Sequence, residues 1–389
     1  MAIQDRNDPK VDVLLLSAVL ALVGLGLVMV YSASAVTAQD KLGDALYYLK
    51  RQAVAAGLGL CAMVLAVKVG YRRMGRLAWP LLGLGVLAML ALFIPGLGVS
   101  VGGARRWLRV PGISFQPTEL VKFAWIVYLS FSLAKKKEQV RDFKAGVAPH
   151  LVVALVLVGL CMLQPDFGSS VVLLSLLLVL LVTAGAKLRN LVMLALLAAP
   201  AAYYAVVSSP YRMKRITAFL DPWARRHAEG YQVAESLMSI GSGGIWGLGL
   251  GNGMQKLYFL PEAHTDFIFS ILGEETGLVG VLVLVGLYAI VIWRGLKAAL
   301  AATEAFGAYL AVGITALIAL QSIINMSVAM GLAPAKGLTL PFVSYGGSSL
   351  IILMGAAGVL LSVGASAPER SRSRTVSNVM RMQAAEVGA

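Results

Sequence analysis

Three side chains that could move protons lie close together in the segment FLPEAHTDFIFS, residues 259–270: Glu262, His264 and Asp266. Asp266 directly precedes a long apolar run. A carboxylate there can act as a general base if it lies within hydrogen-bond distance of an acceptor hydroxyl. The alternative is structural, because Thr265 could cap a helix that starts here and an acid at a helix N-terminus interacts favourably with the helix dipole. The segment by itself leaves both roles open.

Basic side chains gather in the loops on the same side of the apolar runs as Asp266. Clustered positive charge against a low-dielectric wall concentrates anionic ligands. Long loops are largely exempt from the charge bias that orients membrane proteins, so these residues could also be ordinary solvated charges. We favour the anion-binding alternative, with Arg215 and Lys256 among its candidates. The set is Arg105, Arg106, Arg109, Arg212, Lys214, Arg215, Arg225, Arg226 and Lys256.

The amino-acid composition indicates that the segments between these loops are embedded in a membrane. The 389 residues are 59% hydrophobic and only 13% charged, with a mean hydropathy of +0.81. A soluble domain is about half apolar and about a quarter charged, so the chain is an integral membrane protein. Its three histidines show no metal-ligand spacing. Nothing in the sequence indicates a soluble domain, and we expect no nucleic-acid partner.

The apolar runs predict ten membrane-spanning helices, since a spanning helix needs about 20 apolar residues. An even number puts both termini on one side. Short cytoplasmic loops are enriched in Lys and Arg, and KVGYRRMGR and AKKKEQVRDFK place that side in the cytoplasm. The predicted spans are residues 12–33, 52–69, 77–95, 118–134, 148–163, 168–185, 188–206, 266–293, 305–330 and 344–364.

The predicted fold is therefore an all-α polytopic membrane protein with about ten transmembrane helices and a large extracytoplasmic loop between the seventh and eighth. The expected parts are a cytoplasmic tail at 1–11, one membrane domain at 12–364 with its loop at about 207–265, and a cytoplasmic, disordered tail at 365–389.

A few polar residues stand within or beside the spans, where charges are expensive and usually face a protein interior or a watery cavity. Glu119 and Lys122 are three residues apart, so they share a helix face and can pair; structural and functional roles are equally open for them. For Glu274 and Glu275 we favour a structural role. The glycine-dense stretch SIGSGGIWGLGLGNG and the polar SYGGSS, which contains Ser344 and Tyr345, suit irregular or re-entrant backbone that lines a cavity.

Six motifs in this order resemble the SEDS family, the polytopic shape, elongation, division and sporulation proteins. They are GARRWL, FQPTELVK, QPDFGSS, YQVAESLMSIGSGGIWGLGLGNGMQK, LPEAHTDFIFSILGEE and KGLTLPFVSYGGSS. Together they cover nearly the whole chain, and their combination is far more specific than any one of them. The run PAKGLTLPFVSYGG is more similar to the FtsW division branch of the family than to its RodA elongation branch.

The resemblance implies a peptidoglycan glycosyltransferase of the cytoplasmic (inner) membrane that polymerises lipid II into glycan strands at the division septum. Its expected partners are a class B penicillin-binding protein of the FtsI type and other divisome membrane proteins. By motif position Asp266 is the implied catalytic residue. Together with the residues singled out above, the candidates for substrate binding are Arg106, Glu119, Lys122, Asp166, Arg215, Lys256, Glu262, His264, Ser344 and Tyr345.

The implied reaction is attack by a sugar 4-hydroxyl on the anomeric carbon of a lipid-linked sugar, with Asp266 taking the proton. The leaving diphosphate needs stabilisation by arginines, lysines or a divalent cation, Mg²⁺ or Mn²⁺. A single displacement predicts inversion at the anomeric carbon. Two other functions stay open: a lipid II flippase that makes no bonds, since broken helices and intramembrane charges are equally natural in transporters, and a non-catalytic scaffold that recruits division proteins.

Overall fold

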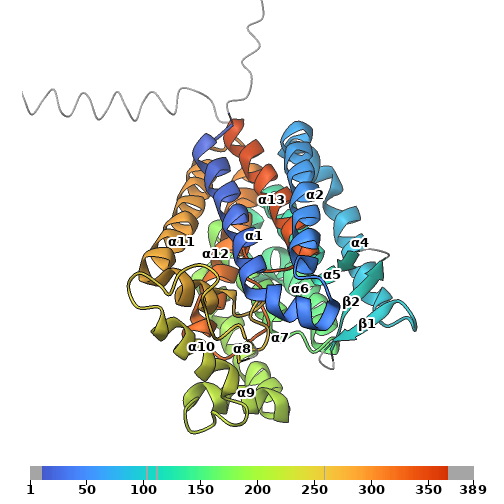
Figure 1. Cartoon of the computed structure of the whole chain (residues 1–389). Helices are drawn as coiled ribbons and strands as arrows, with labels where there is room; N and C mark the ends of the chain where they lie inside the picture. The colour runs from blue at the N-terminus through green and yellow to red at the C-terminus, as the bar shows by residue number, and fades with distance from the viewer. Residues whose placement is uncertain (1–10, 102–103, 111–112, 258, 367–389) are drawn as a thin grey trace, which may run out of the picture.

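The structure is a computed structural model that describes residues 11–101, 104–110, 113–257 and 259–366, and it is a bundle of long helices (Figure 1). The α-helices are α1 (Val13–Leu42), α2 (Tyr47–Val69), α3 (Tyr71–Met74), α4 (Ala78–Ala91), α5 (Pro117–Lys136), α6 (Ala148–Leu163), α7 (Phe167–Thr183), α8 (Leu188–Val207), α9 (Pro210–Leu220), α10 (Tyr231–Ser242), α11 (Ile268–Ala301), α12 (Ala305–Ala329) and α13 (Gly347–Ala365). Short 3₁₀ or π turns cover Gly75–Leu77, Lys137–Arg141 and Phe143–Val147. The predicted all-α membrane fold is confirmed.

Seven helical segments in the described part of the chain are long and apolar enough to cross a membrane, and α7 is a shorter apolar helix. The number of ten spans therefore stays a prediction. The described chain begins and ends at the same end of the bundle, where α1 starts and α13 finishes (Figure 1). Most of both predicted tails lies outside the described residues.

The bundle closes through small residues at helix contacts. α2 packs along α13 more extensively than any other pair of elements. A Cβ added to Gly358 would lie 2.3 Å from the carbonyl oxygen of Met63, and one added to Gly59 would lie 2.5 Å from the sulfur of Met354. Close backbone approach of this kind is the usual way helices associate within a membrane, where burial of apolar surface provides no driving force.

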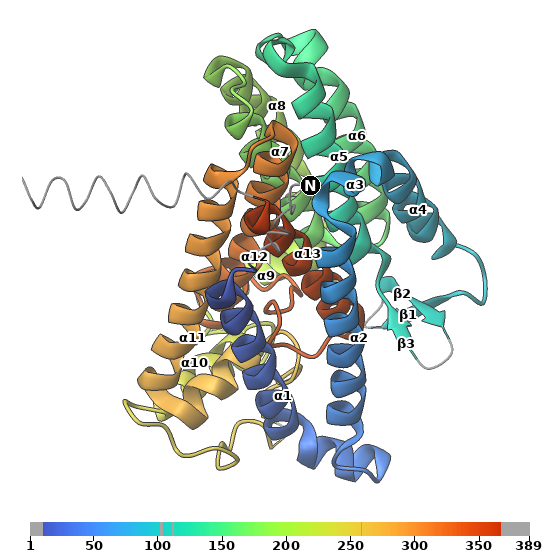
Figure 2. The same ribbon diagram turned by 90° about the horizontal axis from the view of Figure 1, so that it is seen from above.

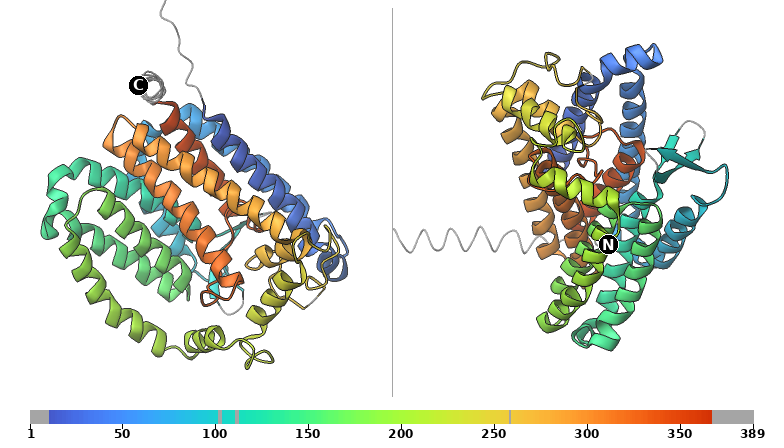
Figure 3. Two further views of the ribbon diagram at one scale, coloured as in Figure 1. Left: turned by 90° about the vertical axis from the view of Figure 1, so that its left-hand side faces the viewer. Right: turned by 90° about the horizontal axis from the view of Figure 1, so that it is seen from below.

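Helices α5, α6, α7 and α8 form one side of the bundle, and α1, α10 and α11 form the other (Figure 2). α8 and α9 run along the outer margin and carry the chain across to α10 (Figure 3). The region predicted as a large loop at about 207–265 therefore contains two helices. Pro210 at the first position of α9 favours helix initiation there, because its missing N–H would have no helical partner.

A small sheet occupies the connection between α4 and α5, where the sequence predicted only a loop. Strands β1 (Gly98–Val101), β2 (Ala104–Val110) and β3 (Ile113–Phe115) pair in the order β1-β2-β3, with both pairs antiparallel. In the register of the first pair, Val99 lies opposite Trp107, an aromatic and β-branched pair of the kind that stabilises strands. The sheet places Arg106 on an ordered strand.

The predicted helix start at Asp266 is wrong by two residues. α11 begins at Ile268, its N-cap is Phe267, and no side chain caps it. The hydroxyl of Thr265 instead donates to the carboxylate of Glu262 at 2.7 Å. The capping role considered for Asp266 is therefore excluded by the backbone, because the residue lies in the loop before the helix.

Candidate active site

The loop that carries Asp266 is held by the loop between α12 and α13. The Ser344 hydroxyl donates to the carbonyl of Thr265 at 2.6 Å, and the backbone N–H of Tyr345 donates to the carbonyl of His264 at 2.9 Å. Ser344 also accepts from the N–H of Leu340 at 2.9 Å. Two residues predicted to bind substrate, Ser344 and Tyr345, therefore supply backbone or hydroxyl bonds that fix the segment just before Asp266.

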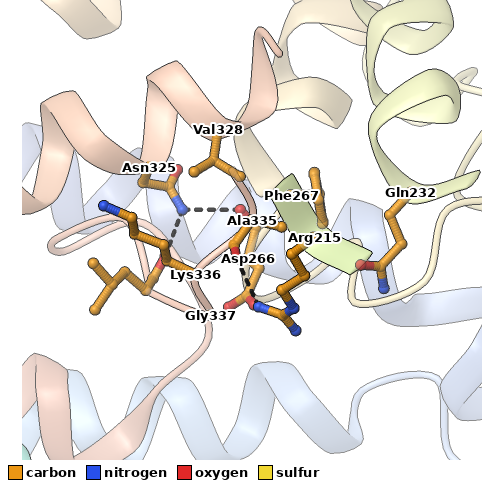
Figure 4. Close-up of a pocket in the computed structure, with 10 residues that line it drawn as sticks. Arg215, Gln232, Asp266, Phe267, Asn325, Val328, Ala335, Lys336 and Gly337 are labelled. Atoms are coloured by element: carbon orange, nitrogen blue, oxygen red, sulfur yellow. Dashed lines mark hydrogen bonds between the residues drawn. The ribbon is translucent and has the colours of Figure 1, made fainter. Parts of the chain in front are cut away.

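Asn325 of α12 completes this support, and sequence reasoning missed it. Its side-chain amide donates to the carbonyl of Asp266 at 2.8 Å and to the carbonyl of Leu338 at 2.7 Å. One buried side chain thus joins the two loops on either side of the site (Figure 4). The sequence feature that could have identified Asn325 is its place inside a predicted span, because polar residues within spans usually face the protein interior and have a specific partner.

Asp266 faces a pocket built from five elements of the chain (Figure 4). α9, α10 and α12 converge on it, together with the loop before α11 and the loop after α12. The space between its lining residues amounts to about 310 Å³, and this volume includes open solvent. The lining residues are Arg215, Gln232, Asp266, Phe267, Asn325, Val328, Ala335, Lys336, Gly337 and Leu338.

Two arginines flank the carboxylate of Asp266. A Cβ added to Gly337 would lie 3.6 Å from both the Arg106 guanidinium and the Asp266 carboxylate, so these two groups border the same small space. Arg215 reaches in from α9 and donates to the carbonyl of Ala335 at 2.8 Å. Gly337 has a positive φ of +67°, a backbone conformation that would be strained with any side chain at this position.

Burial, together with the nearby charge of Glu262, raises the pKa of the Asp266 carboxyl to about 6, although Arg215 and Arg106 oppose the shift. A general base works best when its pKa lies near the working pH. The carboxylate of Asp266 is therefore largely ionised at neutral pH and still able to accept a proton.

Lys336 adds a third cation to the pocket, and sequence reasoning did not single it out. Burial lowers the pKa of its ammonium from the ordinary 10.5. Within the described part of the chain, that ammonium has no hydrogen-bond or salt-bridge partner. A half-buried ammonium without a protein partner is available to an anionic ligand, so Lys336 is a candidate for anion binding. Its position inside KGLTLPFVSYGGSS, one of the six motifs that resemble the SEDS family, could have identified it.

Arg106 is oriented by the connection between α6 and α7. Its guanidinium donates to the carbonyl of Gln164 at 3.3 Å and to the carbonyl of Pro165. Asp166, which was predicted to bind substrate, lies in the same connection. It is 1% exposed, and its side chain accepts hydrogen bonds from the N–H and the hydroxyl of Ser169 at 3.1 and 2.8 Å. Asp166 thus caps α7 and helps to shape the turn whose carbonyls hold Arg106.

Glu119 and Lys122 lie inside the bundle near the start of α5. Their predicted pairing is confirmed: the ammonium of Lys122 lies 2.6 Å from the Glu119 carboxylate, and both side chains are buried. The hydroxyl of Ser349 in α13 donates to the same carboxylate at 3.3 Å. Neither residue lines the Asp266 pocket, and the pair connects α5 to α13.

Lys256 lies apart from the pocket. It is 6% exposed, and its ammonium donates to the Glu275 carboxylate at 2.6 Å and to the Ser32 hydroxyl at 3.0 Å. Glu274 accepts from the backbone N–H of Met254 at 2.7 Å. Glu274 and Glu275 are thus paired inside the bundle, as the structural role favoured for them requires. Lys256 was expected to bind an anionic ligand, but its ammonium already has Glu275 as an internal counter-ion.

Glu262 and His264 lie in the same loop as Asp266, before α11. Glu262 is exposed and adopts a positive φ of 57°. The His264 ring lies 4.5 Å from that of Tyr48, which in turn lies 5.0 Å from Tyr345. Burial lowers the pKa of His264, so this imidazole is neutral at pH 7. The three rings form an aromatic cluster beside the loop that carries Asp266.

Residues 13–369 match the cell cycle protein family that groups FtsW, RodA and SpoVE. The chain belongs to this family. A Geobacter metallireducens protein named probable peptidoglycan glycosyltransferase FtsW is 44% identical over 354 residues, which are 91% of this chain and 94% of the relative. Stage V sporulation protein E of Bacillus subtilis is 40% identical over 352 residues, 90% and 96% of the two chains.

Two solved structures share the fold of this FtsW/RodA/SpoVE family member. A chain from a peptidoglycan synthase complex, described as coordinating polymerization and crosslinking, has a TM-score of 0.76 and 33% identity, covering 91% of this chain and 97% of that one. The rod shape determining protein RodA of Thermus thermophilus has a TM-score of 0.66 and 31% identity, covering 91% and 96%.

Proposed function

We propose that this protein is a peptidoglycan glycosyltransferase, the activity for which its FtsW relatives are named, and that it polymerises lipid II. The observation that carries the proposal is the Asp266 pocket: a carboxylate whose pKa is raised to about 6 faces a space bordered by Arg106, Arg215 and Lys336. A base surrounded by cations suits a reaction in which a hydroxyl loses a proton and a diphosphate departs.

In the proposed step the 4-hydroxyl oxygen of an acceptor N-acetylglucosamine forms a bond to the anomeric carbon of a lipid-linked N-acetylmuramic acid. The bond from that carbon to the phosphate oxygen breaks, and its electron pair leaves with the polyprenyl diphosphate. Asp266 accepts the hydroxyl proton. The guanidinium groups of Arg106 and Arg215 and the Lys336 ammonium stabilise the negative charge on the diphosphate oxygens as the bond breaks.

This arrangement needs one carboxylate, whereas most glycoside hydrolases use two. A hydrolase requires a general acid to protonate a sugar oxygen as it leaves. A diphosphate leaves as a stable anion, so cations replace the acid. A single displacement at the anomeric carbon inverts its configuration, so an α-linked donor yields a β-linked glycan.

A divalent cation, Mg²⁺ or Mn²⁺, would supply the same charge stabilisation of the diphosphate. Over residues 11–366, where the structure describes them, no three His, Cys, Asp or Glu side chains come together as metal ligands. Asp166 is engaged in capping α7, which leaves Asp266 as the carboxylate of the pocket. The pocket is more suitable for an anion than for a resident metal ion, so we derive no step through a metal.

The proposal extends to partners and location. A chain with this fold is part of a solved peptidoglycan synthase complex, which supports a class B penicillin-binding protein as partner. We also propose that the protein works at the division septum with other divisome proteins. Both termini would lie in the cytoplasm, and Asp266 would lie on the extracytoplasmic face. These proposals rest on the division-type sequence motif and on the basic segments KVGYRRMGR and AKKKEQVRDFK.

The test is polymerisation of lipid II in detergent by purified wild type, Asp266→Asn and Glu138→Gln, each prepared together with its class B partner. We expect glycan chains from wild type and Glu138→Gln, and none from Asp266→Asn, because the amide keeps the shape and removes the base. Glu138 is the control, since it is an exposed carboxylate that does not line the pocket.

Two outcomes would contradict this function. If wild type binds lipid II but forms no glycan even with its partner, a flippase is favoured. If Asp266→Asn supports division in cells as well as wild type does, the protein acts as a scaffold and the pocket has another purpose.

A further inference from the structure

The glycine-rich segment between α10 and Asp266 presents apolar side chains outward. Residues 241–255 include no charged residue, in a chain whose formal net charge is +14. Trp246 is 80% exposed, Ile245 is 61% exposed and Leu250 is 60% exposed; Leu248 and Met254 are exposed as well. We call these five side chains the apolar rim. An exposed set of this kind indicates an apolar environment rather than water.

The backbone of this segment is bonded into a break in helix α11. The N–H groups of Leu248 and Gly249 donate to the carbonyls of Glu274 and Glu275, each at 3.0 Å. In return the N–H groups of Leu278 and Val279 donate to the segment, to the carbonyls of Gly244 and Ile245 at 3.0 and 3.2 Å. The irregular backbone and the broken helix therefore satisfy each other's polar groups.

Gly277 makes the break possible. Its φ of +64° and ψ of −163° interrupt the helical backbone inside α11. A Cβ at this position would lie 2.4 Å from the nitrogen of Gly247 and 2.5 Å from the carbonyl oxygen of Ile245. Only glycine permits both the dihedral angles and the close approach, so the segment is held firmly against the spanning helix.

The end of the segment is anchored to the protein interior. The ammonium of Lys256 pairs with Glu275 and Ser32, and the N–H groups of Met254 and Gln255 donate to Glu274. The side-chain amide of Asn252 is exposed and donates to the carbonyl of Leu248 at 3.2 Å within the segment. Irregular backbone is tolerated at membrane depth where it is held against protein in this way.

The apolar rim continues a face of α11 that is suited to lipid. Leu278 and Val279, whose N–H groups bond the segment, are exposed, and so are Leu282 and Val283 one turn further along. α11 is one of the helices long and apolar enough to span the membrane. We propose that residues 243–254 are a re-entrant segment that inserts the apolar rim into the lipid leaflet on the Asp266 side.

A tryptophan at the rim suits this depth, because its amphipathic ring favours the boundary between headgroups and acyl chains. The segment leads within a few residues to the loop that carries Asp266. Its insertion would therefore set the height of Asp266 above the bilayer, where the reactive bond of a lipid-linked sugar lies. This last consequence rests on the proposed function, whereas the insertion does not.

The experiment uses the full chain reconstituted without partner in phosphatidylcholine vesicles, with and without bromine atoms on the upper part of the acyl chains. The fluorescence of Trp246 is obtained as the difference between wild type and Trp246→Phe. We expect this difference emission to be blue-shifted, to lose most of its intensity in brominated lipid, and to respond weakly to acrylamide in the water.

Trp223 provides the matched control. It is also exposed, in the connection between α9 and α10, but stands in the charged sequence DPWARRH. The Trp223→Phe difference is expected to show the opposite pattern, with strong quenching by acrylamide and little by bromine.

The proposal is overturned if the Trp246 difference emission resembles that of Trp223. Shielding of Trp246 only after the class B partner is added would also overturn it, since the rim would then bind protein rather than lipid. Because fluorescence does not depend on turnover, a protein that fails to polymerise lipid II can still confirm the insertion, and the two proposals fail separately.

Discussion

Replacing the proposed base should make the folded protein more stable at neutral pH. The carboxyl of Asp266 ionises at about 6 in the fold, against an ordinary value of 3.8, so ionisation of this group opposes folding. The difference corresponds to roughly 3 kcal/mol, because one pKa unit is worth about 1.4 kcal/mol. The side chain is only half-buried, and solvent screening reduces the expected effect to roughly 1–2 kcal/mol.

The sign follows from proton binding. Between the unfolded value of 3.8 and the folded value of about 6, the folded state binds more protons at Asp266 than the unfolded state does. Stability therefore falls as pH rises through this window, and the full penalty is present above it. Asp266→Asn lacks the titration, so its stability relative to wild type should rise by the same amount as pH rises from about 4 to about 8.

The assay is denaturant unfolding of both proteins in one detergent across this pH range, followed by circular dichroism. Asp44→Asn is a control of opposite sign. A hydrogen bond from Lys50 lowers the pKa of the exposed Asp44, so this variant should be the less stable one at neutral pH and match wild type in acid. If Asp266→Asn loses stability relative to wild type as pH rises, the Asp266 carboxylate is a stabilising structural ion, and the reasoning for a strained base is wrong.

Three further predictions concern residues that surround or support the site. Lys256→Met should destabilise the protein by about 3–5 kcal/mol, since it leaves Glu275 buried without its counter-ion; a second change, Glu275→Met, should recover most of this in unfolding experiments. Asn325→Leu should cost about 2 kcal/mol for two lost hydrogen bonds and reduce polymerisation at every pH, because Asp266 loses its backbone support. Lys336→Gln should lower kcat/KM for lipid II without loss of folding stability, and Lys336→Arg should largely restore it; an unchanged kcat/KM in kinetic assays would exclude stabilisation of the diphosphate by this side chain.

Local sequence patterns predicted the parts of the fold that depend on local physics. The apolar runs located the helices to within a few residues for α6, α12 and α13, because hydropathy over about 20 residues decides membrane insertion. The sheet at residues 98–115 and helices α9 and α10 were not predicted. Their short polar and apolar segments are ambiguous until they pack against other elements.

The sequence by itself determined that the chain is a membrane-embedded helical bundle and that Asp266 is the carboxylate to test, since composition and motif order are properties of the linear chain. Only the tertiary structure decided which charges are available. Lys256 stands in the sequence as an ordinary loop cation, yet the fold pairs it with Glu275 and Ser32. Lys336 and Asn325 line the pocket from the loop after α12 and from α12 itself, far from Asp266 in sequence. Pairing and pKa depend on contacts within a few ångströms between residues distant in sequence, and no local pattern encodes those distances.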